Sequence, residues 1–366
     1  MDSTPIFTAV STSARQLYLL LRCIAFSQRA EVEINPQGIQ FSVEESRVVQ
    51  GLTFLDKALF SSYSCRLPND NDDALPAFSI SLTALLETLQ IFGTAETTSS
   101  ARNPYGGFSS SYGNAFSTPA LALGGTCRIS YQEVGAPLTI TIQEGAVTTI
   151  CEMNTYEVEG PNGGDRGVPL DRSKLCLKAI MRSTWLNDAI AELSGMNPSV
   201  LVVNISKRSA PYFSLEGEGG PFGNSTVDFT PESKNDPATN EAKVKRQPIV
   251  TDTFVVSAPA GSNGRIRQRY KFDMIKTASR AMASATKVSV RQDEQGVLSL
   301  QFMIDLGDGG SGLRGDDSAA VNAPPNPTNV AFVDFKFVPL LDDEETETEV
   351  ETEDEEFEER NLELSP

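Results

Sequence analysis

The chain has 366 residues, of which 39% are hydrophobic and 22% are charged, a composition typical of a soluble globular protein with room for two domains. It contains no histidine, which excludes Ser-His-Asp and Cys-His nucleophiles and removes the commonest zinc ligand. The formal net charge is −19, a value that by itself argues against a polyanionic partner.

The charge is unevenly distributed along the chain. Residues 342–366 contain 14 acids and one base, so this segment carries −13 and the other 341 residues carry only −6. Such a segment repels itself and has little apolar surface to bury, which predicts a disordered acidic tail. No apolar run approaches the ~20 residues needed to cross a bilayer, and the first residues do not resemble a signal peptide. We therefore expect no membrane contact and a nuclear or cytoplasmic protein.

Five cysteines are scattered through the chain without a CxxC pair, and we interpret them as free thiols in a reducing compartment. They are Cys23, Cys65, Cys127, Cys151 and Cys176. Zinc-finger spacing, P-loops and aromatic RNP-like strands are also missing from the sequence. We expect no bound metal and no cofactor.

One structural unit recurs along the chain: a short strand, an amphipathic helix, and alternating strands joined by a polar turn. The predicted helices span residues 14–26, 81–93, 182–195 and 275–285. The predicted strand pairs that follow them span residues 31–45, 126–145, 199–217 and 287–304. Segments without periodicity predict surface loops at residues 94–125, 160–169, 231–248, 258–267 and 307–329. Four helices against many antiparallel strands predict an α+β protein with its helices on one side of the sheets.

Two of these units precede the Gly- and Pro-rich segment GPNGGDRGVP and two follow it, which indicates a duplicated architecture. We therefore predict an N-terminal domain at residues 1–158, a linker at 159–170, a C-terminal domain at 171–341 and the acidic tail at 342–366. A β-rich protein of another kind also shows strand-turn-strand runs, so this pattern alone leaves other folds open.

The first helix has an apolar stripe on one face and cations on the other. The stripe consists of Leu17, Leu20, Leu21 and Ile24. Arg15 and Arg22 lie opposite it, one heptad apart, and Arg29 continues their line if the helical turn persists. The fourth helix repeats this arrangement with Lys276 and Arg280 opposite its apolar side. A face of this kind suits sequence-independent binding of phosphates, although plain solvated surface is the alternative.

Long strings in the sequence resemble one family. They include GIQFSVEESRVVQGLTFLDKALF, ISLTALLETLQIFG, VTTICEMNTYE, PYFSLEGEG, TKVSVRQDEQGVLSLQFMI and VAFVDFKFVPLLDDEE. The family is the Rad-one subunit of the nine-one-one checkpoint clamp, a relative of the proliferating cell nuclear antigen. The strings cover nearly the whole chain outside the acidic tail. The segments at 94–125 and 307–329 are longer than the family pattern, and the tail is unusually acidic.

The resemblance implies a sliding-clamp fold of two similar domains, each a doubled βαβββ unit, with helices on the concave face and sheets outside. It implies a heterotrimer with two other clamp subunits, placed by a clamp loader around double-stranded DNA in the nucleus. Checkpoint and repair proteins then act on the ring. By this resemblance the DNA-facing residues are Arg15, Arg22, Lys276 and Arg280, with Arg182 as a weaker candidate.

The resemblance also implies subunit contacts through two edge strands, since an edge strand offers unpaired backbone groups to another chain. The expected contact residues are Val147, Thr149, Cys151 and Met153 in the first half, and Thr226, Asp228 and Thr230 in the second. The linker is expected to border a groove for partner peptides.

Two rival functions remain at this point. A metal-dependent exonuclease would need carboxylates that converge on two metal ions ~4 Å apart. Its dense acids would have to come from the tail, whereas Asp293 and Glu294 suggest only a solvated hairpin bend. A protein-only β-sandwich scaffold would never surround DNA, and it would show no central opening in its complexes. We expect a non-enzymatic protein.

Overall fold

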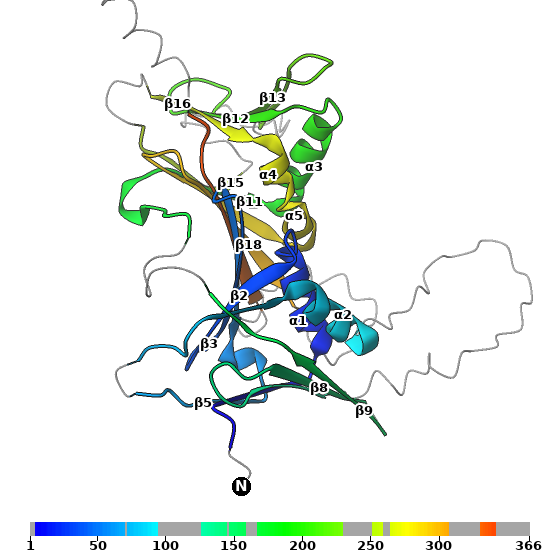
Figure 1. The fold of residues 1–366 in the computed structure, drawn as a ribbon. Coiled ribbons are helices and arrows are strands. Elements are labelled where there is room, and N and C mark those ends of the chain that lie inside the picture. Colours follow the sequence, from blue (N-terminus) through cyan, green and yellow to red (C-terminus); the bar gives the residue numbers. More distant parts are fainter. Residues whose placement is uncertain are drawn as a thin grey trace, which may run out of the picture.

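The computed structural model describes residues 4–69, 72–93, 126–144, 146–158, 167–229, 251–258, 264–306 and 330–341. Within these residues the chain forms three antiparallel β-sheets and five α-helices (Figure 1). The predicted α+β class is therefore confirmed. The acidic tail and the predicted loops at 94–125, 231–248 and 307–329 lie outside the described residues, as does most of the linker.

The largest sheet has ten strands. In spatial order they are β10 (Tyr156–Glu157), β6 (Phe78–Ser81), β2 (Arg29–Asn35), β3 (Gly38–Glu45), β4 (Val49–Asp56), β19 (Val330–Phe337), β18 (Leu298–Asp305), β17 (Lys287–Asp293), β11 (Leu175–Arg182) and β15 (Thr251–Val256). A five-stranded sheet has the order β5 (Ser62–Cys65), β1 (Phe7–Ser11), β7 (Thr126–Tyr131), β8 (Leu138–Glu144) and β9 (Val147–Met153). A four-stranded sheet has the order β14 (Ser225–Asp228), β13 (Phe213–Glu218), β12 (Val200–Ser206) and β16 (Arg265–Lys271).

All four predicted strand pairs are present, as β2–β3, β7–β8, β12–β13 and β17–β18. The first shows how the local sequence sets the register. The Asn35 side-chain oxygen accepts hydrogen bonds from the backbone N–H groups of Gln37 (2.9 Å) and Gly38 (3.0 Å). This arrangement closes a tight turn, after which Asn35 and Gly38 pair across the two strands. Turn chemistry and alternation thus agree on the same register.

The α-helices are α1 (Ala14–Cys23), α2 (Leu82–Gly93), α3 (Ser183–Ser194), α4 (Phe272–Lys276) and α5 (Ser279–Ser284). In Figure 1 they lie on the same side of the ten-stranded sheet, in a row between the two smaller sheets. Helix α1 packs against α2 and α5, and α3 packs against α5. The helices from both halves of the chain therefore form one layer, as the sequence analysis predicted for their side of the sheets.

The prediction of one continuous helix at 275–285 was wrong. The chain forms α4 and α5, with a break at Thr277 and Ala278. The hydroxyl of Thr277 donates to the Met274 carbonyl (2.6 Å), and the hydroxyl of Ser279 donates to the Lys276 carbonyl (2.6 Å). These side-chain bonds compete with the helical backbone pattern at the point where it breaks. The strand β16 ends at Lys271, directly before α4 begins at Phe272.

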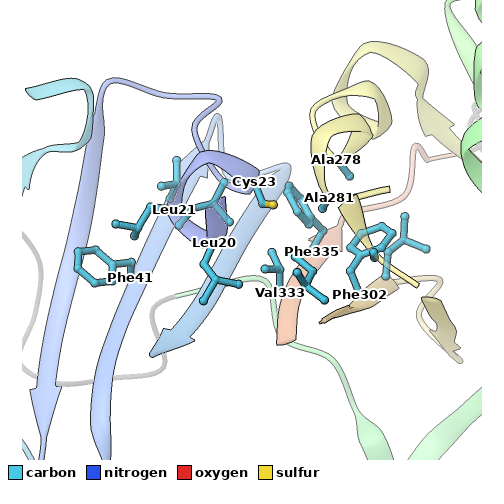
Figure 2. Close-up of a cluster of buried hydrophobic side chains, with 14 of the residues drawn as sticks. Leu20, Leu21, Cys23, Phe41, Ala278, Ala281, Phe302, Val333 and Phe335 are labelled. Atoms are coloured by element: carbon cyan, nitrogen blue, oxygen red, sulfur yellow. The ribbon is translucent and has the colours of Figure 1, made fainter. Parts of the chain in front are cut away.

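The two halves of the chain are joined at the centre of the large sheet, where β4 pairs with β19 over Val49–Thr53 and Val333–Phe337. One hydrophobic core covers this seam. Figure 2 shows the core residues that meet there, from α1, β3, α5, β18 and β19. The labelled ones are Leu20, Leu21, Cys23, Phe41, Ala278, Ala281, Phe302, Val333 and Phe335. Side chains from helices of both halves thus share the space above one strand pair.

A glycine in β4 makes room for the chain that leaves α1. A Cβ atom at Gly51 would lie 2.7 Å from the Phe26 ring and 3.3 Å from the Phe335 ring. With no side chain there, Phe26 packs beside Phe335 with 5.9 Å between ring centroids. The close approach explains why only glycine fits this position without rearrangement.

Asp293 is a further residue whose role the sequence did not reveal. The expected solvated bend is wrong for this residue, because Asp293 is only 1% exposed, while its neighbour Glu294 is exposed. Its carboxylate accepts hydrogen bonds from the backbone N–H groups of Asp171 (3.0 Å), Gln295 (3.0 Å) and Val297 (2.9 Å). The side chain therefore holds the β17–β18 turn and ties it to the segment that enters β11.

The five cysteines are free thiols. Cys23, Cys127 and Cys176 are buried, whereas Cys65 and Cys151 are half-buried. Burial raises the pKa of Cys127 to about 12, because desolvation penalises the thiolate. The thiols thus act as small apolar side chains, in agreement with the sequence analysis.

Candidate nucleic-acid interface

Helix α1 presents two arginines to solvent. Its amphipathic pattern buries Leu17, Leu20 and Leu21 and leaves Arg15 and Arg22 exposed on the opposite face. The helix begins at Ser13, whose hydroxyl oxygen accepts a hydrogen bond from the Gln16 N–H (3.3 Å). Near its other end, the Arg22 guanidinium lies 5.9 Å from the centre of the Tyr18 ring, a contact that restrains the side chain. Sequence periodicity predicted both exposures correctly.

Arg280 of α5 lies next to the end of α1. Its Nη1 atom donates a hydrogen bond to the Ala25 carbonyl (3.2 Å), in the turn that follows α1. Arg22 and Arg280 are both close enough to Cys23 to affect the pKa of its thiol. Burial raises the pKa of Cys23 to about 11, against smaller lowering effects of Ser284, Arg22 and Arg280. The fold therefore brings together cations that are 258 residues apart in the sequence, counted from Arg22 to Arg280.

Lys276 and Arg182 complete the predicted set. Lys276 is exposed at the last residue of α4. Arg182 is exposed as well, but it is the last residue of β11 and precedes α3. Its guanidinium lies 5.5 Å from the Trp185 ring centre. Arg182 therefore contacts the first turn of α3, whereas Arg22 and Arg280 meet at the end of α1.

Arg29 does not continue the line of Arg15 and Arg22. The helix ends at Cys23, and Arg29 is the first residue of β2. Its guanidinium lies over the Tyr156 ring of β10, 4.6 Å from the centroid. The expectation failed because it required the helical turn to persist, whereas Ile24–Phe26 form a tighter turn that leads to the sheet.

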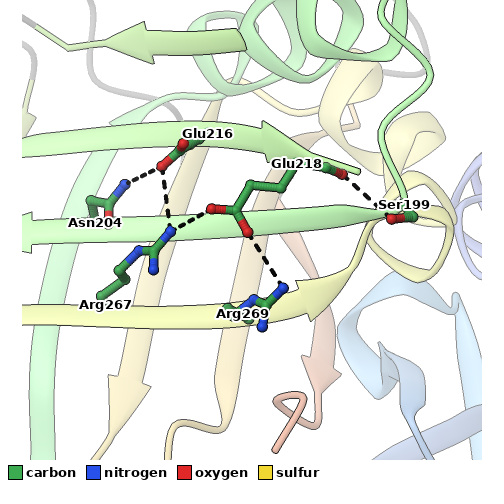
Figure 3. A network of polar contacts seen from close by, with 6 residues as sticks. All are labelled: Ser199, Asn204, Glu216, Glu218, Arg267 and Arg269. Atoms are coloured by element: carbon green, nitrogen blue, oxygen red, sulfur yellow. Dashed lines mark hydrogen bonds and ion pairs between the residues drawn. The ribbon is translucent and has the colours of Figure 1, made fainter. Parts of the chain in front are cut away.

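Two other arginines on the four-stranded sheet have carboxylate partners. Figure 3 shows Arg267 and Arg269 of β16 beside Glu216 and Glu218 of β13. Arg267 forms ion pairs with both glutamates, and Arg269 contacts Glu218 at 3.4 Å. Asn204 of β12 donates to Glu216 at the limit of hydrogen bonding, 3.5 Å. Arg267 and Arg269 thus lie beside two glutamates that compensate their charge within the sheet.

The strand β9 forms one edge of the five-stranded sheet, with β8 as its neighbour among the described strands. Its predicted contact residues differ in exposure. Val147 is 55% exposed and Thr149 is half-buried, but Met153 is buried, and Cys151 accepts a hydrogen bond from Thr88 (3.3 Å). These four alternate residues lie on the face toward α2, because α2 packs on this strand.

The sequence analysis missed Ile150, which lies on the other face of β9 and is 63% exposed. An exposed aliphatic side chain on an edge strand offers apolar surface to a second strand that pairs there. The signal was available in the sequence, because strand alternation places Ile150 opposite Cys151.

The strand β14 forms an edge of the four-stranded sheet beside β13. Of the predicted contact residues, Thr226 and Asp228 are exposed, and Thr230 lies outside the described residues. The turn before β14 also exposes Phe222, which is 71% accessible. The four- and five-stranded sheets lie at opposite ends of the molecule in Figure 1, so β14 and β9 are edge strands at opposite ends.

The part of the chain that the structure describes contains neither a metal-binding cluster nor a membrane-spanning helix. No group of three or more His, Cys, Asp or Glu side chains there could hold a metal ion. Within the same residues, each helix is too short or too polar to span a bilayer.

Comparison with known proteins gives consistent results. The family model described as "Repair protein Rad1/Rec1/Rad17" matches residues 6–304. The DNA damage checkpoint control protein rad1 of Schizosaccharomyces pombe is 29% identical over 304 residues, covering 82% of this chain and 81% of the relative. The human cell cycle checkpoint protein RAD1 is 28% identical, covering 81% and 85%. The Drosophila melanogaster DNA repair protein Rad1 is 19% identical, covering 88% and 89%.

Proposed function

Because the chain belongs to the Rad1/Rec1/Rad17 family of repair proteins, we propose that it is one subunit of a heterotrimeric ring that encircles DNA. The ring serves the DNA damage checkpoint and DNA repair in the nucleus. Its partners are two other clamp subunits, a clamp loader, double-stranded DNA in the channel, and checkpoint and repair proteins. The subunit uses no metal or cofactor and catalyses no reaction in this proposal.

The proposed clamp fold consists of two domains, at residues 1–158 and 171–341, joined by a linker at 159–170. The tail at 342–366 follows the second domain. The continuous pairing of β4 with β19 supports this arrangement, because it fixes both domains in one sheet. Their helices then face the same side, which is the concave, DNA-facing side in the proposed ring.

A single observation carries the proposal: one layer of helices bears exposed cations and lies between two available sheet edges. Arg15, Arg22, Lys276 and Arg280 are exposed on that layer. Contacts of Lys and Arg with phosphates depend on charge and release counterions, so they read no base sequence. A protein that slides along DNA needs this kind of contact. Arg182 is a secondary contact in the proposal, because its side chain is exposed beside Trp185.

The two edges support head-to-tail assembly. Strand β9 has exposed Val147 and Ile150, whereas β14 has exposed Thr226 and Asp228. These edges differ from each other, so a contact of β9 with an edge like β14 is heterologous and generates a ring when the rotation closes. Backbone hydrogen bonds between edge strands would supply much of the affinity. Thr149, Cys151, Met153 and Thr230 belong to the proposed interface through their backbone groups.

Assembly provides the test. The chain is co-expressed with two candidate clamp subunits, and the complex is examined by native mass measurement and electron microscopy. We expect a 1:1:1 complex with a central opening wide enough for duplex DNA. A stable complex without an opening would instead support a protein-only scaffold.

A substitution at the β9 edge makes the test residue-specific. Ile150→Glu places a charge on the exposed edge and is expected to weaken the ring at one interface. Val134→Glu is the matched control, because Val134 is 55% exposed but lies in the turn between β7 and β8. Equal assembly of both variants would exclude β9 as a subunit contact.

A further inference from the structure

The ten-stranded sheet has a second face, opposite the helices, with a groove of about 460 Å³ over its C-terminal half. Strand alternation defines this face. Val288 and Val290 of β17 are buried toward the helices, so Lys287, Ser289 and Arg291 point to the other side. The groove crosses β11, β17, β18 and β19, and Arg172 lies at its border.

The side chains that line the groove combine positive charge with apolar surface. The four cations are Arg172, Lys178, Lys287 and Arg291, and no carboxylate is among the ten lining residues. Lys178 and Arg291 are directly opposite each other on β11 and β17. The apolar lining includes Ile180, Met303 and Phe332, of which Phe332 is 49% exposed. A peptide that fits this surface carries carboxylates and a few apolar side chains.

The electrostatics around Arg291 favour an additional carboxylate. Its side chain is 11% exposed, and its Nη2 atom is 3.8 Å from Asp334 Oδ1, so the ion pair is loose. Its Nε and Nη2 atoms are buried without a hydrogen-bond partner. Burial lowers the pKa of Arg291, with Asp334 acting in the opposite direction. The single carboxylate therefore compensates the buried guanidinium only in part.

We propose that this groove is the docking site of the chain's own acidic tail, residues 342–366. The tail carries 14 acids and one base, and its apolar side chains are Val350, Phe357, Leu362 and Leu364. It directly follows Leu341, four residues after β19, the strand that contributes Phe332 to the groove. Phe332 is five residues before the end of β19, about 17 Å back along the strand. A tail of 25 residues can easily cover that distance.

Docking of the tail makes it an internal competitor. The docked segment covers the cations and Phe332, so an acidic segment of another protein has to displace it before it binds there. Because the tail has a high effective concentration at its own chain, another protein displaces it only when that protein is abundant or binds tightly. The groove lies on the face away from the helices, so tail docking requires neither the proposed ring nor DNA binding.

Zero-length carbodiimide cross-linking of the full chain tests the proposal, because the reagent joins a lysine to a carboxylate only where they form a close pair. We expect links from Lys178 and Lys287 to tail carboxylates, which disappear in high salt. Lys174 is the internal control, since it is exposed on the same segment as Arg172 but does not line the groove. A mixture of isotope-labelled and unlabelled chains separates links within one chain from links between chains.

Two variants define the outcome. Arg172→Glu reverses a cation at the border without removing a cross-linking site, and it should lower the Lys178 and Lys287 links about fivefold. Lys174→Glu, with the same charge change, should leave them unaltered. Tail links that go mainly to Lys276 on the helix layer, spread evenly over exposed lysines, or ignore Arg172→Glu would overturn the proposal. Links formed only between different chains would overturn it as well.

Discussion

Neutralising the helix-face cations should flatten the salt dependence of DNA binding. The decisive variant carries Arg15→Gln, Arg22→Gln and Lys276→Gln, because these side chains are exposed on α1 and α4. Arg280 is left intact, since its hydrogen bond to the Ala25 carbonyl links α5 to the end of α1. The substitutions therefore remove three positive charges and keep the hydrogen bond between α5 and the end of α1.

The magnitude follows from counterion release, which contributes a slope of about −0.9 per neutralised phosphate in a plot of log K against log salt. Three lost contacts change the slope by about 2.7. Between about 50 and 200 mM salt, the affinity of the unmodified ring should fall about 40-fold more than that of the variant. Cations that contact phosphate only part of the time give a smaller difference.

The assay is fluorescence anisotropy of a short linear duplex with the assembled ring, measured at several salt concentrations. The matched control carries Lys174→Gln, Lys207→Gln and Arg208→Gln, which remove the same charge from exposed positions outside the α-helix layer. An unchanged slope in the helix variant, or an equal change in the control, would refute the channel assignment. Thermal unfolding of both variants should match that of the unmodified chain.

Three further predictions concern the fold. Gly51→Val should destabilise the chain by about 1–3 kcal/mol in denaturant unfolding, because its side chain collides with Phe26; unaltered stability would contradict the packing. Asp293→Ala should cost about 3 kcal/mol by the same measurement, since three N–H groups lose their acceptor, whereas Glu294→Ala is the neutral control. Between pH 9 and about 11, unfolding free energy should fall as pH rises, because the unfolded Cys23 thiol ionises while the folded thiol stays protonated. Cys23→Ala should lessen that fall, and an identical pH profile would count against the buried thiol.

Sequence periodicity correctly predicted side-chain exposure and strand pairing where a single helix or turn determines them. The heptad from Arg15 to Arg22 fixed both exposures, because a helix of ten residues places its apolar stripe and its cations by geometry alone. The turn at Asn35 and Gly38 likewise fixed a register locally. These features need no information about the rest of the fold.

Sequence periodicity gave wrong or incomplete predictions where tertiary contacts or side-chain hydrogen bonds determine the local structure. The break between α4 and α5 depends on hydroxyl bonds of Thr277 and Ser279, which a pattern of apolar residues does not contain. The burial of Asp293 depends on the N–H of Asp171, which is 122 residues away. The proximity of Arg280 to the end of α1 has the same origin, since it follows from the packing of the two halves.

The seam between the halves is what turns separate cations into one surface. Pairing of β4 with β19 fixes the sheets, and the core in Figure 2 fixes α1 and α5 above them. The Arg280 bond to Ala25 then closes the helix layer across the same seam. Because both halves share backbone pairing, core and helix contacts, hinge motion between them would break all three. In the proposed ring, this rigid support keeps the spacing of the cations fixed, so DNA binding requires no ordering of the backbone that carries them.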